Sequence, residues 1–161
     1  MGRARGGYLP AIMQTFLPYP DFAAGAATLD DRRLGKQRVE ALQVLRALVR
    51  EGYGWQHHPA VRMWRGFPEA VAAYGLAVCA EWSGRGKADT VADSIAADLA
   101  AAGLPAPRSQ AELEEDGLLP KWLGDERLHR SHRAALVAKL PEHYASRFPD
   151  DDRGGEYFWP V

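Results

Sequence analysis

The fold class of this chain is decided by residues 28–52, which read TLDDRRLGKQRVEALQVLRALVREG. Apolar residues recur there every three or four positions, so at about 100° per residue they share one face of a helix. That face consists of Leu34, Ala41, Leu42, Leu45, Leu48 and Val49. Thr28 is the expected N-cap and Gly52 the expected stop. The stretch therefore predicts one long amphipathic helix.

Outward from this helix, the remaining patterns are also helical. Proline at a first helical position predicts helices that begin at Pro59 and Pro68. Periodic apolar residues predict a peripheral helix over residues 88–102 and a last long helix over residues 125–140, and Ser109 is the expected cap of a short acidic helix. No stretch alternates polar and apolar residues as a strand does. We expect an all-α protein.

The two ends of the chain differ from its middle. Residues 1–12 carry three glycines and no periodicity, which predicts a flexible arm. Residues 14–22 contain two prolines, which favour an extended segment. The aromatic tail over residues 157–160 is expected to pack back on the body. We therefore expect one compact helical domain over residues 13–161, preceded by the arm over residues 1–12.

Composition excludes several classes of protein. The chain has 161 residues, of which 47% are hydrophobic and 25% charged, and it has no apolar run of the roughly 20 residues that cross a membrane. A net charge of -1 argues against coating nucleic acid through overall charge. The single cysteine, Cys79, is expected in the core, and with no secretory signal the sequence predicts a cytoplasmic protein.

Charge is nevertheless concentrated between Leu29 and Arg65, which include eight basic and four acidic residues. Guanidinium groups bind phosphates, and neighbouring tryptophans offer surfaces on which bases stack. The competing interpretation is an ordinary solvated helix face with a Lys36 to Glu40 surface pair. The candidate nucleic-acid contacts of this region are Arg33, Arg38, His57, His58, Arg62, Trp64 and Arg65, with Trp55 beside them.

Two residues of the first helix have unusual positions. Arg38 projects toward the apolar face, where a charge is costly unless it is paired or lines a pocket. Glu40 lies on the side of Arg33 and Lys36, and cations around a carboxylate tend to keep it ionised. Such a carboxylate suits proton transfer or the stabilisation of positive charge.

The histidines do not form a metal motif. His57 and His58 are adjacent and point in different directions, and no third ligand lies at a metal spacing. On the last long helix, His129, His132 and Arg133 share one face, which makes His132 and Arg133 further candidates for contact with DNA. The glycines match neither a phosphate-binding loop nor a dinucleotide fingerprint. We expect no metal and no cofactor.

Several short motifs together resemble the pyrimidine-dimer DNA glycosylase family, in an actinobacterial branch grouped with it. The matching motifs are Leu29-Asp30, Leu34, Arg38, Glu40-Ala41-Leu42, His58-Pro59, Lys121-Trp122-Leu123-Gly124 and Pro141-Glu142-His143-Tyr144. The resemblance implies a compact all-α fold that grips damaged duplex DNA, kinks it and flips a nucleotide out. It also implies that an N-terminal α-amine attacks the sugar and that one glutamate assists.

By this resemblance the glutamate is Glu40, and the phosphate contacts are Arg33 and Arg38. The amine would belong to Met13 if translation begins there, although Gln14 is too large for the usual removal of an initiator methionine. Lys36, one turn before Glu40, is the substitute amine, because lysines with a lowered pKa form Schiff bases.

The leading hypothesis is a DNA-repair glycosylase, with or without AP lyase activity, whose partner is damaged duplex DNA. One alternative is a non-catalytic nucleic-acid-binding module of the same fold. Another is an enzyme or binder of a small nucleotide-like anion, which the near-neutral pI favours. No membrane partner is expected, and the oligomeric state is left open.

Overall fold

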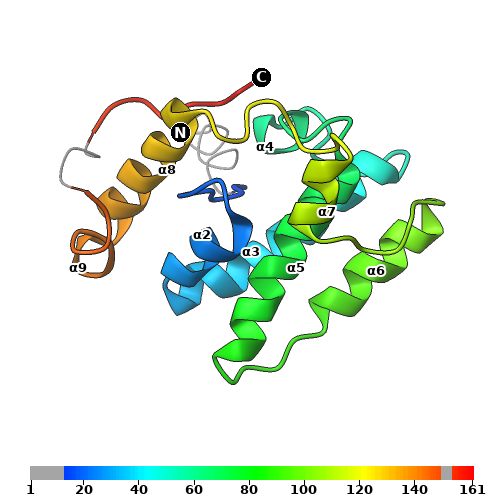
Figure 1. Ribbon diagram of the computed structural model, residues 1–161, viewed down its shortest axis with the longest axis horizontal. Coiled ribbons are helices and arrows are strands. Elements are labelled where there is room, and N and C mark those ends of the chain that lie inside the picture. The colour runs from blue at the N-terminus through cyan, green and yellow to red at the C-terminus, as the bar shows by residue number, and fades with distance from the viewer. Residues whose placement is uncertain (1–12, 150–153) are drawn as a thin grey trace, which may run out of the picture.

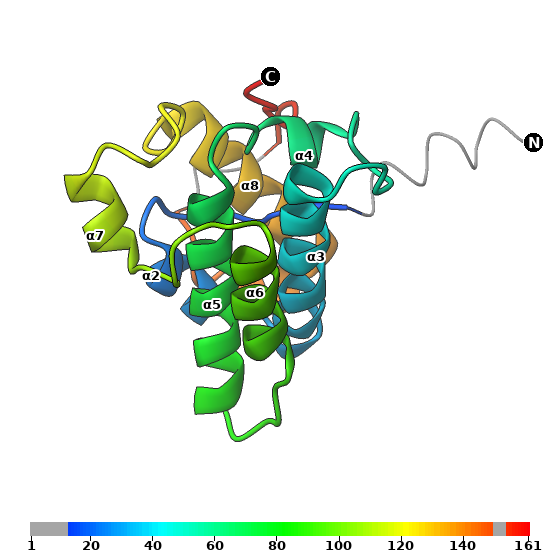
Figure 2. The ribbon, with the colours of Figure 1, turned by 90° about the vertical axis from the view of Figure 1, so that its right-hand side faces the viewer.

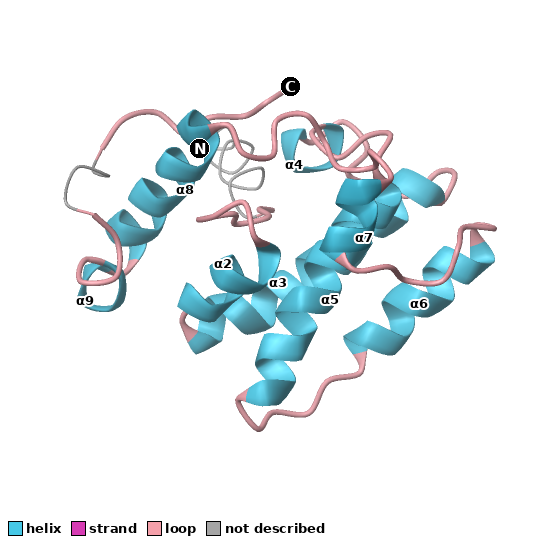
Figure 3. Cartoon of the chain, viewed as in Figure 1, coloured by secondary structure: helices cyan, strands magenta, loops and turns pink. Residues whose placement is uncertain are grey.

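The computed structural model describes residues 13–149 and 154–161, and all regular elements in those residues are helices (Figure 3). They are α2 (Phe22–Thr28), α3 (Asp31–Val49), α4 (Pro59–Arg62), α5 (Pro68–Gly84), α6 (Val91–Ala101), α7 (Gln110–Glu115), α8 (Glu126–Lys139) and α9 (Pro141–Tyr144). The all-α prediction is confirmed. The arm predicted over residues 1–12 lies outside the described residues.

Helices α3, α5 and α6 pack against one another and form the main body (Figures 1 and 2). Gly75 on α5 permits this packing, since a Cβ atom there would lie 2.8 Å from Ile95 Cδ1 of α6 and 3.0 Å from Ala41 Cβ of α3. Gly35 on α3 similarly lies under the ring of Trp82, whose Cη2 would be 2.8 Å from an added Cβ. Two glycines thus set how closely these helices approach.

The beginning of the long helix differs from the prediction. Thr28 is not its N-cap, because Thr28 ends the separate helix α2, and Asp30 caps α3 by accepting a hydrogen bond from the backbone nitrogen of Arg33 at 3.3 Å. Asp21 caps α2 in the same way, through the nitrogen of Ala24. The sequence of α2, FAAGAAT, has small residues and a glycine in place of an apolar stripe, so periodicity did not reveal it.

The other helix boundaries follow local rules. Pro59 and Pro68 occupy first helical positions, and Ser109 forms a capping box at the start of α7, as predicted. Helix α6 begins at Val91 because Asp89 accepts the first free backbone N–H groups, those of Val91 and Ala92. This helix packs against α3 and α5 through a narrow buried stripe and lies at the edge of the fold, as predicted (Figure 1).

Helices α8 and α9 lie on the other side of the N-terminal segment from α5 and α6 (Figure 1). The segment over residues 13–17, here called segment 13–17, joins α8 to the body. The backbone nitrogen of Leu17 donates to His132 Nδ1 at 2.9 Å, and His129 Nδ1 donates to the Leu17 carbonyl at 2.8 Å. A short stretch of extended chain therefore holds α8 in place.

The aromatic tail packs back on the body, as predicted. The backbone nitrogen of Phe158 donates to Ser131 Oγ of α8 at 3.0 Å, and the rings of Tyr157, Phe158 and Trp159 pack against the core. Cys79 is buried in that core. Within the described residues, no helix is both long and apolar enough to span a bilayer.

Candidate active site

Glu40 lies in the middle of α3 and is only 5% exposed. Its Oε1 atom accepts hydrogen bonds from the side-chain amide of Gln37 at 2.8 Å and from the backbone nitrogen of Gln14 at 3.2 Å. Its Oε2 atom lies 3.8 Å from Lys36 Nζ. One buried carboxylate is thus held by a neighbouring side chain and by the start of segment 13–17.

Burial decides the charge of this carboxylate. Loss of hydration raises the pKa of Glu40 to about 7 from an ordinary 4.5, although the Gln14 nitrogen, Lys36 and Gln37 each act to lower it. The expectation that surrounding cations keep Glu40 ionised is therefore wrong, because the cost of burial outweighs them. Near neutral pH, Glu40 exists in both protonation states, which suits a group that gives or takes a proton.

Gln37 connects Glu40 to segment 13–17. Its Oε1 atom accepts from the backbone nitrogen of Phe16 at 2.8 Å and lies 2.7 Å from the hydroxyl of Tyr74 on α5. These contacts orient the amide, so that its nitrogen faces Glu40. On the same segment, Thr15 Oγ1 accepts from the indole nitrogen of Trp64 at 3.1 Å. The backbone beside Glu40 is consequently fixed from two sides.

Both predicted amine sources lie near this carboxylate. Met13 is buried and directly precedes the nitrogen that contacts Glu40. Lys36 approaches the other carboxylate oxygen from one turn earlier, and its side chain is about half exposed. The structure thus places Lys36 and the backbone that follows Met13 beside Glu40.

The aromatic tail covers the same region. The ring of Tyr157 stacks on His132 at a centroid distance of 4.6 Å, and its buried hydroxyl has no hydrogen-bond partner in the described part of the chain. Burial and the nearby Glu40 carboxylate both raise the pKa of Tyr157. The tail therefore places a phenol beside the catalytic candidate.

Beyond the tail, aromatic rings continue to the surface near α4. Trp159 lies 4.9 Å from Tyr157 and 6.1 Å from His58, and His58 lies 5.7 Å from Trp55, all measured between ring centroids. We call these four rings the aromatic row. The predicted contacts His57, Arg62 and Arg65 are exposed and lie in the same stretch of chain as Trp55 and α4. His58 instead caps α4, since its Nδ1 atom accepts from the nitrogen of Ala60.

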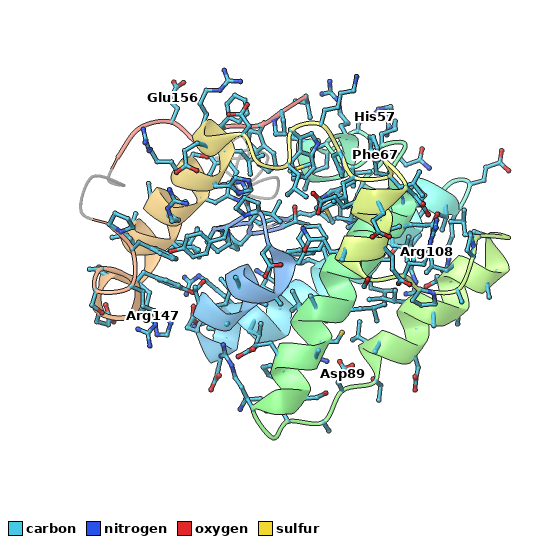
Figure 4. The ribbon with its side chains drawn as sticks, in the orientation of Figure 1. His57, Phe67, Asp89, Arg108, Arg147 and Glu156 are labelled. Carbon is cyan, nitrogen blue, oxygen red and sulfur yellow. The ribbon has the colours of Figure 1, made fainter. Side chains whose placement is uncertain are left out.

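Two predicted phosphate contacts are engaged elsewhere. Arg38 pairs with Asp89 at 2.5 Å and lies over the Trp82 ring at 4.5 Å, which is the buried structural pair that its position on the helix allowed. In Figure 4, Asp89 lies toward the far end of α5 and α6 from His57. Arg33 pairs with Asp30. The structure does not bring these two arginines together with the exposed cations near α4.

Three other candidates lie in the interior. Trp64 and His132 have no exposed surface, because Trp64 packs in the core against Trp122 and His132 binds Leu17. Arg133 is also buried, and it bonds the Pro18 carbonyl and Glu126. In this structure none of the three is exposed.

Sequence reasoning missed Gln37, Tyr74 and Tyr157, which surround Glu40. Gln37 lies three residues before Glu40 on the helix, a spacing that could have indicated their contact. For the two tyrosines no local pattern exists, because they reach Glu40 from other parts of the chain. Within the described residues, no group of three or more His, Cys, Asp or Glu side chains could hold a metal ion.

Comparison with known families gives a match over the first part of the described chain. The sequence model described as pyrimidine dimer DNA glycosylase matches residues 13–94, just over half of the 161 residues. The matched stretch begins at segment 13–17 and includes Glu40, Gln37 and the loop that carries Trp55. No curated protein and no solved structure matches the chain.

Proposed function

Because this chain belongs to the pyrimidine dimer DNA glycosylase family, we propose that it excises damaged bases from duplex DNA with Glu40 as its catalytic carboxylate. The observation that carries the proposal is the contact between the buried Glu40 carboxylate and the nitrogen of Gln14, at 3.2 Å. A carboxyl group with a pKa of about 7 can serve as an acid or as a base at neutral pH.

Base excision breaks the bond between the sugar C1′ atom and the base. In the acid role, protonated Glu40 gives its proton as the base leaves with the bonding electron pair. A nucleophile forms the new bond to C1′, and ionised Glu40 then accepts the proton that the nucleophile loses. A nucleotide stacked within a duplex cannot reach a carboxylate that is 5% exposed, so the damaged nucleotide must leave the stack.

We propose an amine as this nucleophile. In a chain that begins at Met13, the α-amine is one residue from the nitrogen that contacts Glu40, and consecutive Cα atoms are about 3.8 Å apart. The amine nitrogen bonds to C1′ as the base departs with its electron pair, and the nitrogen then loses one proton. Its lone pair forms a second bond to C1′ as the C1′–O4′ bond breaks and O4′ takes up a proton, which leaves a Schiff base on the opened sugar. That intermediate supports strand cleavage, which is the AP lyase activity.

Lys36 is the second amine in reach, since its Nζ atom lies 3.8 Å from Glu40 Oε2. Borohydride reduces a Schiff base to a stable adduct, so the two sources can be separated by trapping the protein on duplex DNA that contains an abasic site. Peptide mass then locates the adduct. Attachment at Met13 supports the terminal amine, attachment at Lys36 supports the lysine, and no adduct contradicts the lyase step while base release remains testable.

The proposal is tested with Glu40→Gln on duplex DNA that carries a cyclobutane pyrimidine dimer. The substitution preserves volume and one hydrogen-bond acceptor but removes the proton-transfer group. We expect base release to fall by about 100-fold or more, the usual effect of losing a general acid or base.

The matched control is Glu114→Gln, which changes the charge equally at an exposed position on α7. It is expected to release base at the wild-type rate. Thermal denaturation of both variants shows that each is folded. Equal base release by Glu40→Gln and wild type would remove Glu40 from the reaction.

A further inference from the structure

Trp55 has an unusual backbone conformation. In residues 13–149 and 154–161, it is the one non-glycine residue with a positive φ, at 72°. A Cβ atom crowds the backbone in this left-handed region, so bulky residues rarely adopt it, while glycine does so freely. The chain therefore retains a large side chain at a position where glycine would fit with less strain.

The structure holds the Trp55 ring at the surface. The ring is 42% exposed, and its inner edge rests on His58. The Trp55 carbonyl accepts from the backbone nitrogen of His58 at 3.0 Å, and His58 is itself fixed as the cap of α4. Exposed aromatic area on a braced turn loses little side-chain freedom when it binds a flat partner.

The surroundings of Trp55 are cationic. Arg62 and Arg65 are exposed, and neither takes part in an ion pair within the described residues. Arg65 donates to the Gln56 carbonyl at 2.5 Å, which places its guanidinium beside the Trp55 turn. Between residues 50 and 66 the sequence has a single carboxylate, Glu51. This charge complements phosphate.

A cavity of about 460 Å³ adjoins the turn. Its walls include Gln56, His57 and Arg65 on one side, and Ala47 and Leu48 of α3 on the other. Ala47 is seven residues after Glu40, so the cavity lies about 10 Å along the helix axis from the catalytic candidate. The aromatic row leads from Tyr157 to Trp55 through centroid distances of 4.9, 6.1 and 5.7 Å.

We propose that Trp55 is a base-stacking residue, whose indole packs against a base at a kinked step of the bound duplex while Arg62 and Arg65 contact the adjoining phosphates. The inference rests on the proposed function and adds a DNA contact at the outer end of the aromatic row, away from Glu40. Apolar side chains act in this way when they wedge into partly unstacked steps. The positive φ is retained because it aims the ring outward.

The test measures binding to a duplex with a stable abasic-site analogue, which the enzyme does not cleave. For Trp55→Gly we expect the affinity to fall by about 10-fold, as the loss of one base-aromatic stack does. The slope of log affinity against log salt is expected to stay unchanged, because stacking releases no counterions. The melting temperature is expected to rise by about 2–4 °C, since glycine relieves the strained φ.

The controls separate stacking from charge and from folding. Trp55→Tyr keeps an aromatic face and is expected to stay within about 3-fold of wild-type affinity. Val39→Ala alters an apolar residue that is also 42% exposed, and its affinity is expected to match wild type. Arg62→Gln and Arg65→Gln are each expected to reduce the salt slope by about 1.

Wild-type affinity in Trp55→Gly overturns the inference, and so does an affinity loss that comes with a lower melting temperature, since that shows a structural role. If wild type fails to release bases but still binds DNA through Trp55, the glycosylase proposal fails and the stacking contact stands. If the wild-type protein binds no DNA, both the glycosylase proposal and the stacking role of Trp55 are wrong.

Discussion

The backbone nitrogen of Gln14 lies 3.2 Å from Glu40 Oε1, which brings the start of the described chain onto the middle of α3. Gln37 strengthens the contact, since its side chain bonds both Glu40 and the nitrogen of Phe16. The carboxylate therefore depends on segment 13–17 for its position. In turn, the segment contributes to the cost of charging Glu40, because it buries the group.

Because the pKa of Glu40 is raised in the folded protein, we expect the stability of the protein to depend on pH. Its pKa is about 7 in the folded protein and near 4.5 in an ordinary exposed environment, so the folded state binds the proton more tightly. The contribution of Glu40 is therefore full below about pH 4.5 and is lost as pH rises to about 7, by about 3 kcal/mol. We expect Glu40→Gln to be more stable than wild type at pH 8 and to lose this advantage at pH 4.5. Urea denaturation at both pH values measures the difference in the free energy of unfolding between the two proteins. The same difference at pH 4.5 and pH 8 would contradict the expected pH dependence.

For His132 we expect stability to change with pH in the opposite direction. Burial lowers its pKa to about 3 from 6.5, and its Nδ1 atom must stay unprotonated to accept from Leu17. Its contribution is present above about pH 6.5 and is lost as pH falls toward 3, because the unfolded chain takes up the proton first. His132→Leu leaves the Leu17 N–H group unpaired and is expected to cost about 1–3 kcal/mol at pH 7. Denaturation at pH 7 and pH 5 should show a smaller loss at pH 5, whereas an equal loss at both would argue against a neutral buried histidine.

A side chain added at Gly75, where α3, α5 and α6 meet, is expected to lower the free energy of unfolding. The added Cβ of Gly75→Ala would lie 2.8 Å from Ile95 Cδ1, so the substitution is expected to destabilise by about 1–3 kcal/mol despite the better helix propensity of alanine. Gly84→Ala on the same helix meets nothing within 4 Å and is expected to be neutral or stabilising by about 0.5 kcal/mol. Chemical denaturation of both variants tests the pair, and equal stability would mean that α5 and α6 can separate at no cost.

Loss of the Arg38 side chain is expected to lower stability and to leave the salt dependence of DNA binding unchanged. Its pair with Asp89 is largely buried, so Arg38→Gln is expected to destabilise by about 3 kcal/mol by leaving Asp89 without its partner. Its guanidinium lies away from the exposed cations near α4, so the salt slope of DNA binding is expected to stay at the wild-type value. Arg62→Gln provides the contrast, with unchanged stability and a slope lower by about 1. A reduced slope in Arg38→Gln would show that the arginine contacts phosphate.

Local features of the sequence were sufficient for much of the fold. Proline at positions 59 and 68, serine at 109 and the apolar period of α3 act over one or two helical turns, so a short window contains the whole cause. Helix α2 escaped the same reasoning because its small residues carry no apolar stripe. The position of Glu40 beside Arg33 and Lys36 made it a candidate, and the family resemblance assigned its catalytic role.

The sequence by itself determined most of the helical segments, α2 excepted, and which residue types could act on DNA. The tertiary structure decided which of these residues are exposed and which are buried or paired, because burial and pairing arise from contacts between distant residues. Glu40 meets Gln14 across 26 positions and His132 meets Leu17 across 115. Such contacts changed the expected charge of Glu40, placed Trp64 in the core and left Trp55 at the surface with a positive φ. A pattern read within one helix contains none of this, since desolvation depends on everything that packs around a group.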